Sequence, residues 1–168
     1  MPPRTPEAKP EAHWAALALI AAGTLLTAAL GGYASVSAQS FYQSLNQPAW
    51  APPASVFGPV WTLLYLMMAT AAWLVVRRRG STAARPAMAW FAAQLVFNAA
   101  WTWLFFRWHL GAAAFVEVLM LLALVAITLR TFWRVRALAG WLLLPYLVWV
   151  TFASALTFAV WQLNPGVL

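Results

Sequence analysis

Two amide side chains and a tryptophan share one face of an apolar segment near the middle of the chain. Gln94, Asn98 and Trp101 are separated by four and three residues, which places them on one side of a helix. If the segment crosses a bilayer, its amides must find hydrogen-bond partners in neighbouring helices or in a wet cavity. Two interpretations therefore stay open: interhelical hydrogen bonds worth about 1 kcal/mol each, or the polar edge of a ligand pocket.

Aromatic side chains form comparable faces on two other apolar segments. One face repeats every four residues from Phe57 to Tyr65, and the other every three residues from Tyr146 to Phe152. Contacts between membrane helices favour small residues, so these faces, together with the amide face, predict an apolar cavity with a few polar groups. The predicted ligand-binding residues are Trp50, Phe57, Trp61, Tyr65, Gln94, Asn98, Trp101, Tyr146, Trp149 and Phe152.

Residues for acid–base or metal chemistry are scarce. Glu117 is the only acid outside the N-terminal tail, and within an apolar segment it is either a functional group or a protonated, hydrogen-bonded side chain. His13 and His109 fall on opposite faces of the membrane in the predicted topology, so they do not ligate one iron together. Without cysteine or a phosphate-binding or metalloprotease motif, hydrolase, kinase and metalloenzyme chemistry has no residues to use. These residues require no cofactor.

The composition places these residues in a membrane. Hydrophobic residues make up 64% of the 168 residues and charged residues only 8%, against about 25% in soluble domains. Five apolar segments come close to the roughly 20 residues that a transmembrane helix needs. They span Trp14–Ala34, Val56–Val76, Ala87–Phe106, Ala112–Phe132 and Leu138–Leu163. We predict an all-α membrane protein with a single bundle of five transmembrane helices over residues 13–168, after a disordered cytoplasmic N-terminus over residues 1–12.

The long connection in this prediction is the first loop, at about residues 35–55. Pro48, Pro52 and Pro53 restrict its backbone, because proline fixes φ and biases the preceding residue to extended geometry. We expect a shaped lid in which Trp50 points down over the pocket mouth; the alternative role of Trp50 is interfacial anchoring. Pro145 lies inside the fifth segment, where it either kinks the helix or marks its entry from the interface.

Basic residues flank the segments unequally. One predicted side of the membrane holds most of the basic residues: Arg4, Lys9 and the arginines of the connections 77–85 and 130–136. The other side holds Arg107. The positive-inside rule then places the N-terminus in the cytoplasm and the first loop and C-terminus outside, in either the inner or the outer membrane of a bacterium. The net charge of +7 is thus a topology signal, and no nucleic-acid partner is expected.

A ridge of small residues runs along the first segment. Gly23, Thr27 and Gly31 recur every four residues. Small residues at this spacing let two helices approach closely. The ridge predicts either a contact inside the bundle or the seam of a homodimer.

The chain resembles the tryptophan-rich sensory protein family, also called the translocator protein or peripheral benzodiazepine receptor family, as a bacterial member. The resemblance covers about Gly31 to Asn164 and depends on the order and spacing of four motifs. The first motif is the loop from Leu45 to Pro53. The other three comprise Trp61, Leu64 and Tyr65; Gln94, Asn98, Trp101, Phe105 and Phe106; and Pro145, Tyr146, Trp149, Phe152, Ala153, Leu163 and Asn164.

The resemblance implies a bundle of five helices, often paired as a homodimer, with a pocket beneath the first loop. It implies that the second, third and fifth helices form this pocket, and that porphyrins, with haem as a further candidate, and benzodiazepine-type aromatic ligands bind there. The implied role is that of a sensor, regulator or carrier in tetrapyrrole or stress responses, with membrane lipid as a further partner. The alternative function is a light-dependent porphyrin-degrading enzyme in which Trp61 and Trp149 are catalytic.

The chain departs from the family pattern at a few positions. Gln47 stands where the family commonly has Lys, and Thr157 stands where it often has Asn. The C-terminal sterol motif is missing, because Ala159–Leu163 contains neither the Tyr nor the basic residue that the motif requires. The sequence therefore gives no support for sterol binding.

Overall fold

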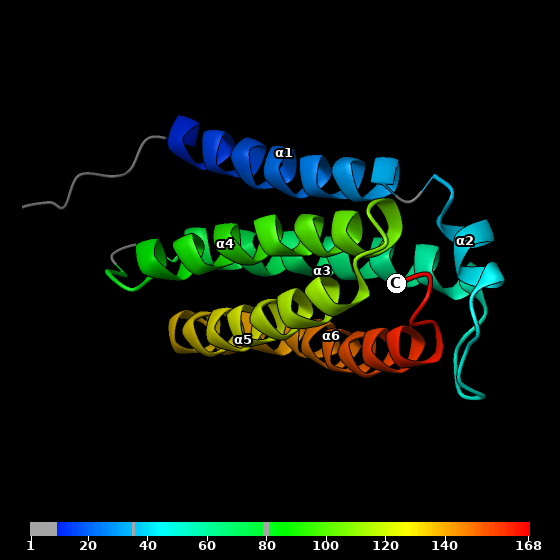
Figure 1. Cartoon of the computed structure of the whole chain (residues 1–168). Coiled ribbons are helices and arrows are strands. Elements are labelled where there is room, and N and C mark those ends of the chain that lie inside the picture. The colour runs from blue at the N-terminus through cyan, green and yellow to red at the C-terminus, as the bar shows by residue number, and fades with distance from the viewer. Residues whose placement is uncertain (1–9, 35, 79–80) are drawn as a thin grey trace, which may run out of the picture.

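The computed structural model describes residues 10–34, 36–78 and 81–168, and these form a bundle of long helices (Figure 1). Five helices within this part of the chain are long and apolar enough to cross a membrane, which confirms the predicted fold class. They are α1 (Pro10–Ala34), α3 (Phe57–Val76), α4 (Ala84–Thr102), α5 (Gly111–Val135) and α6 (Ala137–Leu163). Most of the predicted disordered tail, residues 1–12, lies outside the described residues, and α1 begins at Pro10.

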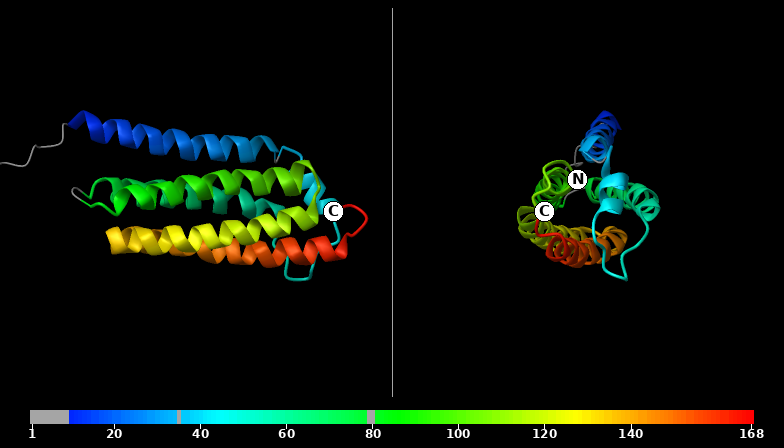
Figure 2. Two further views of the ribbon diagram at one scale, coloured as in Figure 1. Left: turned by 60° about the vertical axis from the view of Figure 1, so that its left-hand side comes forward. Right: turned by 45° about the vertical axis from the view of Figure 1, so that its right-hand side comes forward.

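The five long helices close into a ring (Figure 2). α1 packs on α3 and α4, α3 packs on α6, α6 packs on α5, and α5 packs on α4. The buried side chains at the centre of this ring include Met68, Tyr146 and Val150. Because α3 and α6 are neighbours, the two aromatic faces of the sequence meet on adjacent helices.

α1 joins the ring through its small residues. A Cβ on Gly31 would lie 3.6 Å from Thr102 Oγ1, and a Cβ on Gly23 would lie 4.0 Å from Leu95 Cδ1. Both neighbours belong to α4, so the ridge makes the contact within the bundle that the first interpretation predicted. α1 also exposes leucines such as Leu19 and Leu25. The homodimer seam stays a prediction.

Three short elements connect the ends of the long helices and were not predicted from the sequence. α2 (Ala38–Ser44) forms inside the first loop and is followed by η1 (Ala54–Val56), a single 3-10 turn that leads into α3. At the end of α4, η2 (Trp103–Arg107) is a turn of π-helix. His109 follows with φ of 55°, and its ring stacks on Phe41 of α2 with centroids 4.0 Å apart. This stack joins α2 to the turn that leads into α5.

The connections on the opposite end of the bundle are short and basic. Arg136 has an extended backbone and separates α5 from α6. The α3–α4 connection, this joint and the start of α1 lie at one end, whereas α2, the first loop and the C-terminus lie at the other (Figure 1). α6 continues as one helix through Pro145. The separation of charge along the bundle therefore agrees with the order of basic residues in the sequence.

Candidate ligand-binding site

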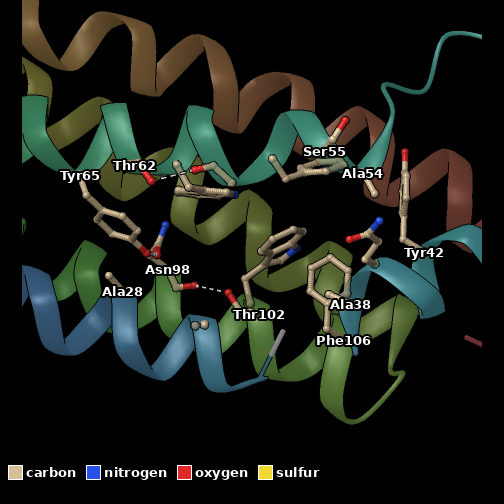
Figure 3. Close-up of a pocket in the computed structure, with 17 residues that line it drawn as sticks. Ala28, Ala38, Tyr42, Ala54, Ser55, Thr62, Tyr65, Asn98, Thr102 and Phe106 are labelled. Carbon is tan, nitrogen blue, oxygen red and sulfur yellow. Dashed lines mark hydrogen bonds between the residues drawn. The ribbon is translucent and has the colours of Figure 1, made fainter. Parts of the chain in front are cut away.

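A cavity of about 570 Å³ lies between α1, α3 and α4, beneath α2 and η1 (Figure 3). Its volume falls within the roughly 300–1,000 Å³ of small-molecule pockets. Aromatic side chains line two of its sides, and glycine and alanine line the third. The space exists because α1 brings small residues to a position where larger side chains would fill the ring.

α3 supplies the longest aromatic wall. Phe57, Trp61 and Tyr65 all line the cavity, as their four-residue spacing predicts for one face of a helix. The rings of Trp61 and Tyr65 lie 5.7 Å apart at an angle of 32°. Pro59 is tolerated in the first turn of α3, where the missing amide proton has no helical partner in any case. The helix therefore begins directly at the cavity and presents its aromatic face from the first turn.

α4 supplies a mixed wall. Asn98, Trp101 and Thr102 line the cavity on the side opposite α3, and Phe106 of η2 extends this wall toward the loop. The Trp101 ring stacks on Phe105 at 5.8 Å and 13°. Trp101 Nε1 is buried and has no hydrogen-bond partner among the described residues. An indole donor is thus held beside the cavity without a protein acceptor.

α1 and α2 form the remaining wall and the roof. Ala28, Gly31 and Gly32 line the cavity from α1, while Gln39 and Tyr42 line it from α2. The small residues of α1 let it approach α4 closely and still leave the cavity open above. A larger side chain at any of these three α1 positions would therefore project into the cavity.

A buried hydrogen-bond network supports the amide of Asn98. The Tyr65 hydroxyl donates to Asn98 Oδ1 at 2.6 Å, and Asn98 Nδ2 donates to the Tyr146 hydroxyl at 3.0 Å. The Tyr146 hydroxyl donates in turn to Gln94 Oε1 at 3.0 Å. The network joins α3, α4 and α6, so the interhelical interpretation of the two amides is confirmed. Asn98 also lines the cavity, so its second interpretation, the polar edge of a ligand pocket, stays a prediction.

A second layer of aromatic rings lies behind the α3 wall. Trp149 packs edge-on against Trp61 at 6.5 Å and against Phe57 at 5.9 Å. Phe152 packs on Trp149 at 5.5 Å, and Trp50 of the loop packs edge-on against Phe152 at 5.8 Å. Trp149 and Phe152 fill the space beside α6, so this helix backs the α3 wall instead of lining the cavity.

The first loop is held by hydrogen bonds at two places. The Tyr42 hydroxyl donates to the Pro52 carbonyl at 3.3 Å, and burial raises the pKa of Tyr42, so this donor stays protonated. Asn164, at the end of α6, accepts from the Asn46 amide at 2.9 Å and donates to the Asn46 carbonyl at 2.9 Å. Asn164 therefore clasps the loop to the C-terminal end of the bundle.

Comparison with known proteins identifies the fold family. Residues 15–162 match the TspO/MBR family, which is nearly the whole chain. This chain belongs to the TspO/MBR family. A tryptophan-rich sensory protein of Cereibacter sphaeroides is 41% identical over 124 residues, 74% of this chain and 77% of the relative. Protein CrtK of Rhodobacter capsulatus is 38% identical over 128 residues (76% and 80%), and the translocator protein of Homo sapiens is 34% identical over 128 residues (75% and 76%).

Membership of the TspO/MBR family and five apolar helices together make this chain a multi-pass membrane protein. The family assignment confirms the resemblance drawn from the loop and helix motifs. The cavity of this family member differs from the expected one in one wall, because α1 lines it and α6 does not. Its place beneath the first loop agrees with the expectation.

The predicted site residues fall into three groups in this TspO/MBR protein. The cavity-lining group is Phe57, Trp61, Tyr65, Asn98 and Trp101. Gln94 and Tyr146 lie beneath the cavity in the network, and Trp149, Phe152 and Trp50 lie behind the α3 wall. Trp50 is 52% exposed and packs on α6, so the structure has it on the far side of the wall from the cavity.

Several cavity residues of this family member were not predicted from the sequence. Thr102 is one turn after Asn98 and Phe106 one further turn, so helical spacing was the available signal. Gly31 was noted only as part of a ridge for helix contact. Gln39 and Tyr42 had no signal, because α2 is too short to show a periodic pattern.

Glu117 remains apart from the cavity. Its side chain is buried in α5, and neither carboxylate oxygen has a hydrogen-bond partner in the described part of the chain. The hydrogen bond that one interpretation required is therefore not present. An unpaired, buried carboxylate is costly when charged.

The two histidines lie at opposite ends of the bundle, as predicted. His13 is in the first turns of α1, and His109 follows η2 beside α2. The described residues hold no cluster of three metal-binding side chains. The chemistry that this cavity offers is therefore stacking on aromatic rings and hydrogen bonding to uncharged groups.

Proposed function

We propose that this chain binds flat aromatic ligands of the porphyrin type, and benzodiazepine-type compounds, in the cavity between α1, α3 and α4. The observation that carries the proposal is the meeting of the α3 aromatic wall with the Asn98 amide around one space of about 570 Å³. The wall offers stacking area, and the amide and neighbouring hydroxyls match the polar edge of such a ligand.

The bound ligand makes the protein a sensor, regulator or carrier. Two relatives are named a tryptophan-rich sensory protein and a translocator protein, and these names favour signalling or transport over metabolism. The polar side chains around the cavity, such as Gln39, Thr62 and Thr102, are uncharged. Uncharged donors and acceptors favour recognition, because proton transfer to a ligand needs a titratable partner near its working pH.

The loop clasp gives the site a way to retain its ligand. α2 forms the roof, and the Asn46–Asn164 hydrogen bonds hold the chain that follows it. A ligand that leaves through the roof must displace α2, which is stacked on His109 through Phe41. Ligand release is thereby coupled to the position of the first loop.

The proposed orientation places the arginine-rich end in the cytoplasm and the cavity near the outer face. The chain has no cysteine, so single introduced cysteines report their side of the membrane without background. An impermeant maleimide applied to intact cells should label Gln43→Cys and spare Thr82→Cys; the reverse pattern would overturn this orientation.

Protoporphyrin titration tests the ligand site. Quenching of tryptophan fluorescence measures the affinity of the purified protein, and Trp61→Phe should weaken binding because it removes indole stacking area from the cavity wall. Trp90→Phe is the matched control, since Trp90 is partly exposed on α4 outside the cavity lining. Equal affinities for Trp61→Phe, Trp90→Phe and the unaltered protein would refute the site.

A specific contact favours the alternative enzymatic function. Trp61 lines the cavity and packs against Trp149 at 6.5 Å, so an electron can pass between the two rings. Under this alternative, illumination of a bound porphyrin with dioxygen as the oxidant yields a defined product, and Trp149→Phe slows its formation without changing affinity. Product formation that is equal in both proteins, or in free tryptophan solution, would leave binding as the function.

A further inference from the structure

A second hollow lies on the outer surface of the bundle, near the arginine-rich end of α5 and α6. Its volume is about 640 Å³. Six of its lining residues belong to α5, and Leu147 closes it from α6. It is separate from the proposed porphyrin cavity, which α1, α3 and α4 enclose. We call it the α5 groove.

Two arginines stand at one end of the α5 groove. Arg130 and Arg134 are four residues apart, so they lie on the same face of α5. Both side chains are exposed. Glu117 is the only acid whose side chain the structure describes, and it is buried about three and a half turns away along α5. Neither arginine therefore has a carboxylate partner in the described part of the chain.

The rest of the α5 groove is apolar. Ala126 and Ile127 line it about one to two turns before the arginines along α5, and Leu147 lines it from α6. From Arg134 to Ala126 is eight residues, which spans about 12 Å along the helix axis. The groove thus has positive charge at the bundle end and an apolar wall that continues toward the middle of the membrane. A small soluble anion would leave this wall uncovered, whereas an amphiphile covers it.

Trp133 gives the α5 groove a fixed shape. A Cβ on Gly140 would lie 2.5 Å from Trp133 Cε3, so the indole sits directly on the α6 backbone where only glycine fits. The same indole lies 4.6 Å from the ring of Trp141. Trp133 lies near the arginine-rich end of α5, which is where the membrane–water interface is expected, and tryptophan is enriched at such interfaces. The ring forms the side of the groove next to the two arginines.

We propose that the α5 groove binds one anionic phospholipid from the leaflet at the arginine-rich end of the bundle. The phosphate of the headgroup lies between Arg130 and Arg134, because the guanidinium fork matches phosphate geometry. One acyl chain lies along Ala126, Ile127 and Leu147. A zwitterionic lipid is disfavoured, because the ammonium group of its headgroup is repelled by the two arginines, which have no carboxylate partner in the described part of the chain.

Native mass spectrometry of the purified full chain tests this proposal. The protein in detergent receives equal amounts of palmitoyl-oleoyl phosphatidylglycerol and phosphatidylcholine, and the retained lipid is counted. We expect one phosphatidylglycerol per chain in preference to phosphatidylcholine. The double variant Arg130→Gln/Arg134→Gln should lose this preference by roughly 30-fold, which corresponds to about 2 kcal/mol for two arginines near a membrane surface.

The matched control is the double variant Arg78→Gln/Arg85→Gln. It removes the same charge from exposed positions at the same end of the bundle, outside the α5 groove. This control should keep the preference for phosphatidylglycerol. Equal loss in both double variants would mean diffuse attraction to charge and would overturn the site.

A third variant tests the apolar wall. Ala126→Phe adds bulk in the groove at an exposed position and leaves both arginines in place. It should reduce lipid retention while the thermal unfolding midpoint stays unchanged. Unchanged retention in Ala126→Phe would refute acyl-chain binding, and so would competition by glycerol phosphate as effective as that by the lipid. None of these outcomes depends on porphyrin binding, so this proposal and the proposed function fail separately.

Discussion

The hydroxyl of Tyr146 is the centre of the network beneath the cavity, and its removal is the sharpest test of the bundle's interior. Tyr146→Phe keeps the ring and deletes one oxygen. That oxygen accepts from Asn98 Nδ2 and donates to Gln94 Oε1, both at 3.0 Å. All three side chains are essentially inaccessible, with exposed fractions of 0% for Tyr146 and 1% for each amide. Water therefore has little access to the groups that would lose their partner.

The expected cost follows from these two bonds. Interhelical hydrogen bonds in membranes average about 0.6 kcal/mol and reach about 1.7 kcal/mol, so two of them give about 1 to 3 kcal/mol. The buried amide groups left without a partner place the result in the upper half of this range, because an unsatisfied buried group costs about 1–3 kcal/mol by itself. We expect Tyr146→Phe to lower the free energy of unfolding by about 2 kcal/mol.

Reversible unfolding by denaturing detergent, followed by circular dichroism, measures this change. Tyr33→Phe is the control, since Tyr33 is 67% exposed and its hydroxyl forms no hydrogen bond in the described structure. The control should leave the free energy of unfolding unchanged. A loss for Tyr146→Phe no greater than that for Tyr33→Phe would refute the argument that this network holds α4 against α6.

Three further substitutions test the loop and the helix contacts. Asn164→Ala removes the clasp on Asn46 and should speed hydrogen exchange of the Asn46 amide, as measured by mass spectrometry; unchanged exchange would contradict the clasp. Trp50→Ala removes a ring that packs on Phe152 behind the α3 wall, so it should lower ligand-free stability and leave the ligand off-rate in stopped-flow fluorescence unchanged; a raised off-rate with unchanged stability would instead support the lid role that the sequence predicted. Gly111→Ala places a Cβ 2.6 Å from Trp161 Cδ1, so the thermal midpoint should fall in a melting scan. An unchanged midpoint would show that Trp161 moves freely.

The five helices could be predicted because each depends on one strong signal, a long apolar run with few charges. Only one side of the network could be predicted. Helical spacing places Gln94 and Asn98 on one face, but that Tyr146 is their shared partner depends on how α4 and α6 pack. The predicted ends of the segments lie within about four residues of the observed helices, as expected when caps are weak.

The walls of the cavity were harder to predict than its aromatic residues. Trp61 and Trp149 both lie on aromatic faces, and the sequence does not show that Trp149 stands behind Trp61. That order follows from the close packing of α3 on α6. Gly31 indicates that a helix approaches closely, but glycine carries no information about which helix it meets or whether a space remains. α2 was missed because seven residues give too short a pattern.

A single glycine gives the most direct test of the ligand site. Gly58 lines the cavity from α3, and a Cβ there meets no atom within 4 Å, so the side chain of Gly58→Phe can leave the backbone without a clash and occupy part of the cavity. Gly166→Phe is the matched control, since a Cβ on Gly166 also meets no atom within 4 Å and this residue lies outside the cavity. Protoporphyrin titration should show at least about a tenfold loss of affinity for Gly58→Phe, or about 1.4 kcal/mol, and none for Gly166→Phe. Unchanged affinity in Gly58→Phe, with the protein folded, would contradict binding in this cavity.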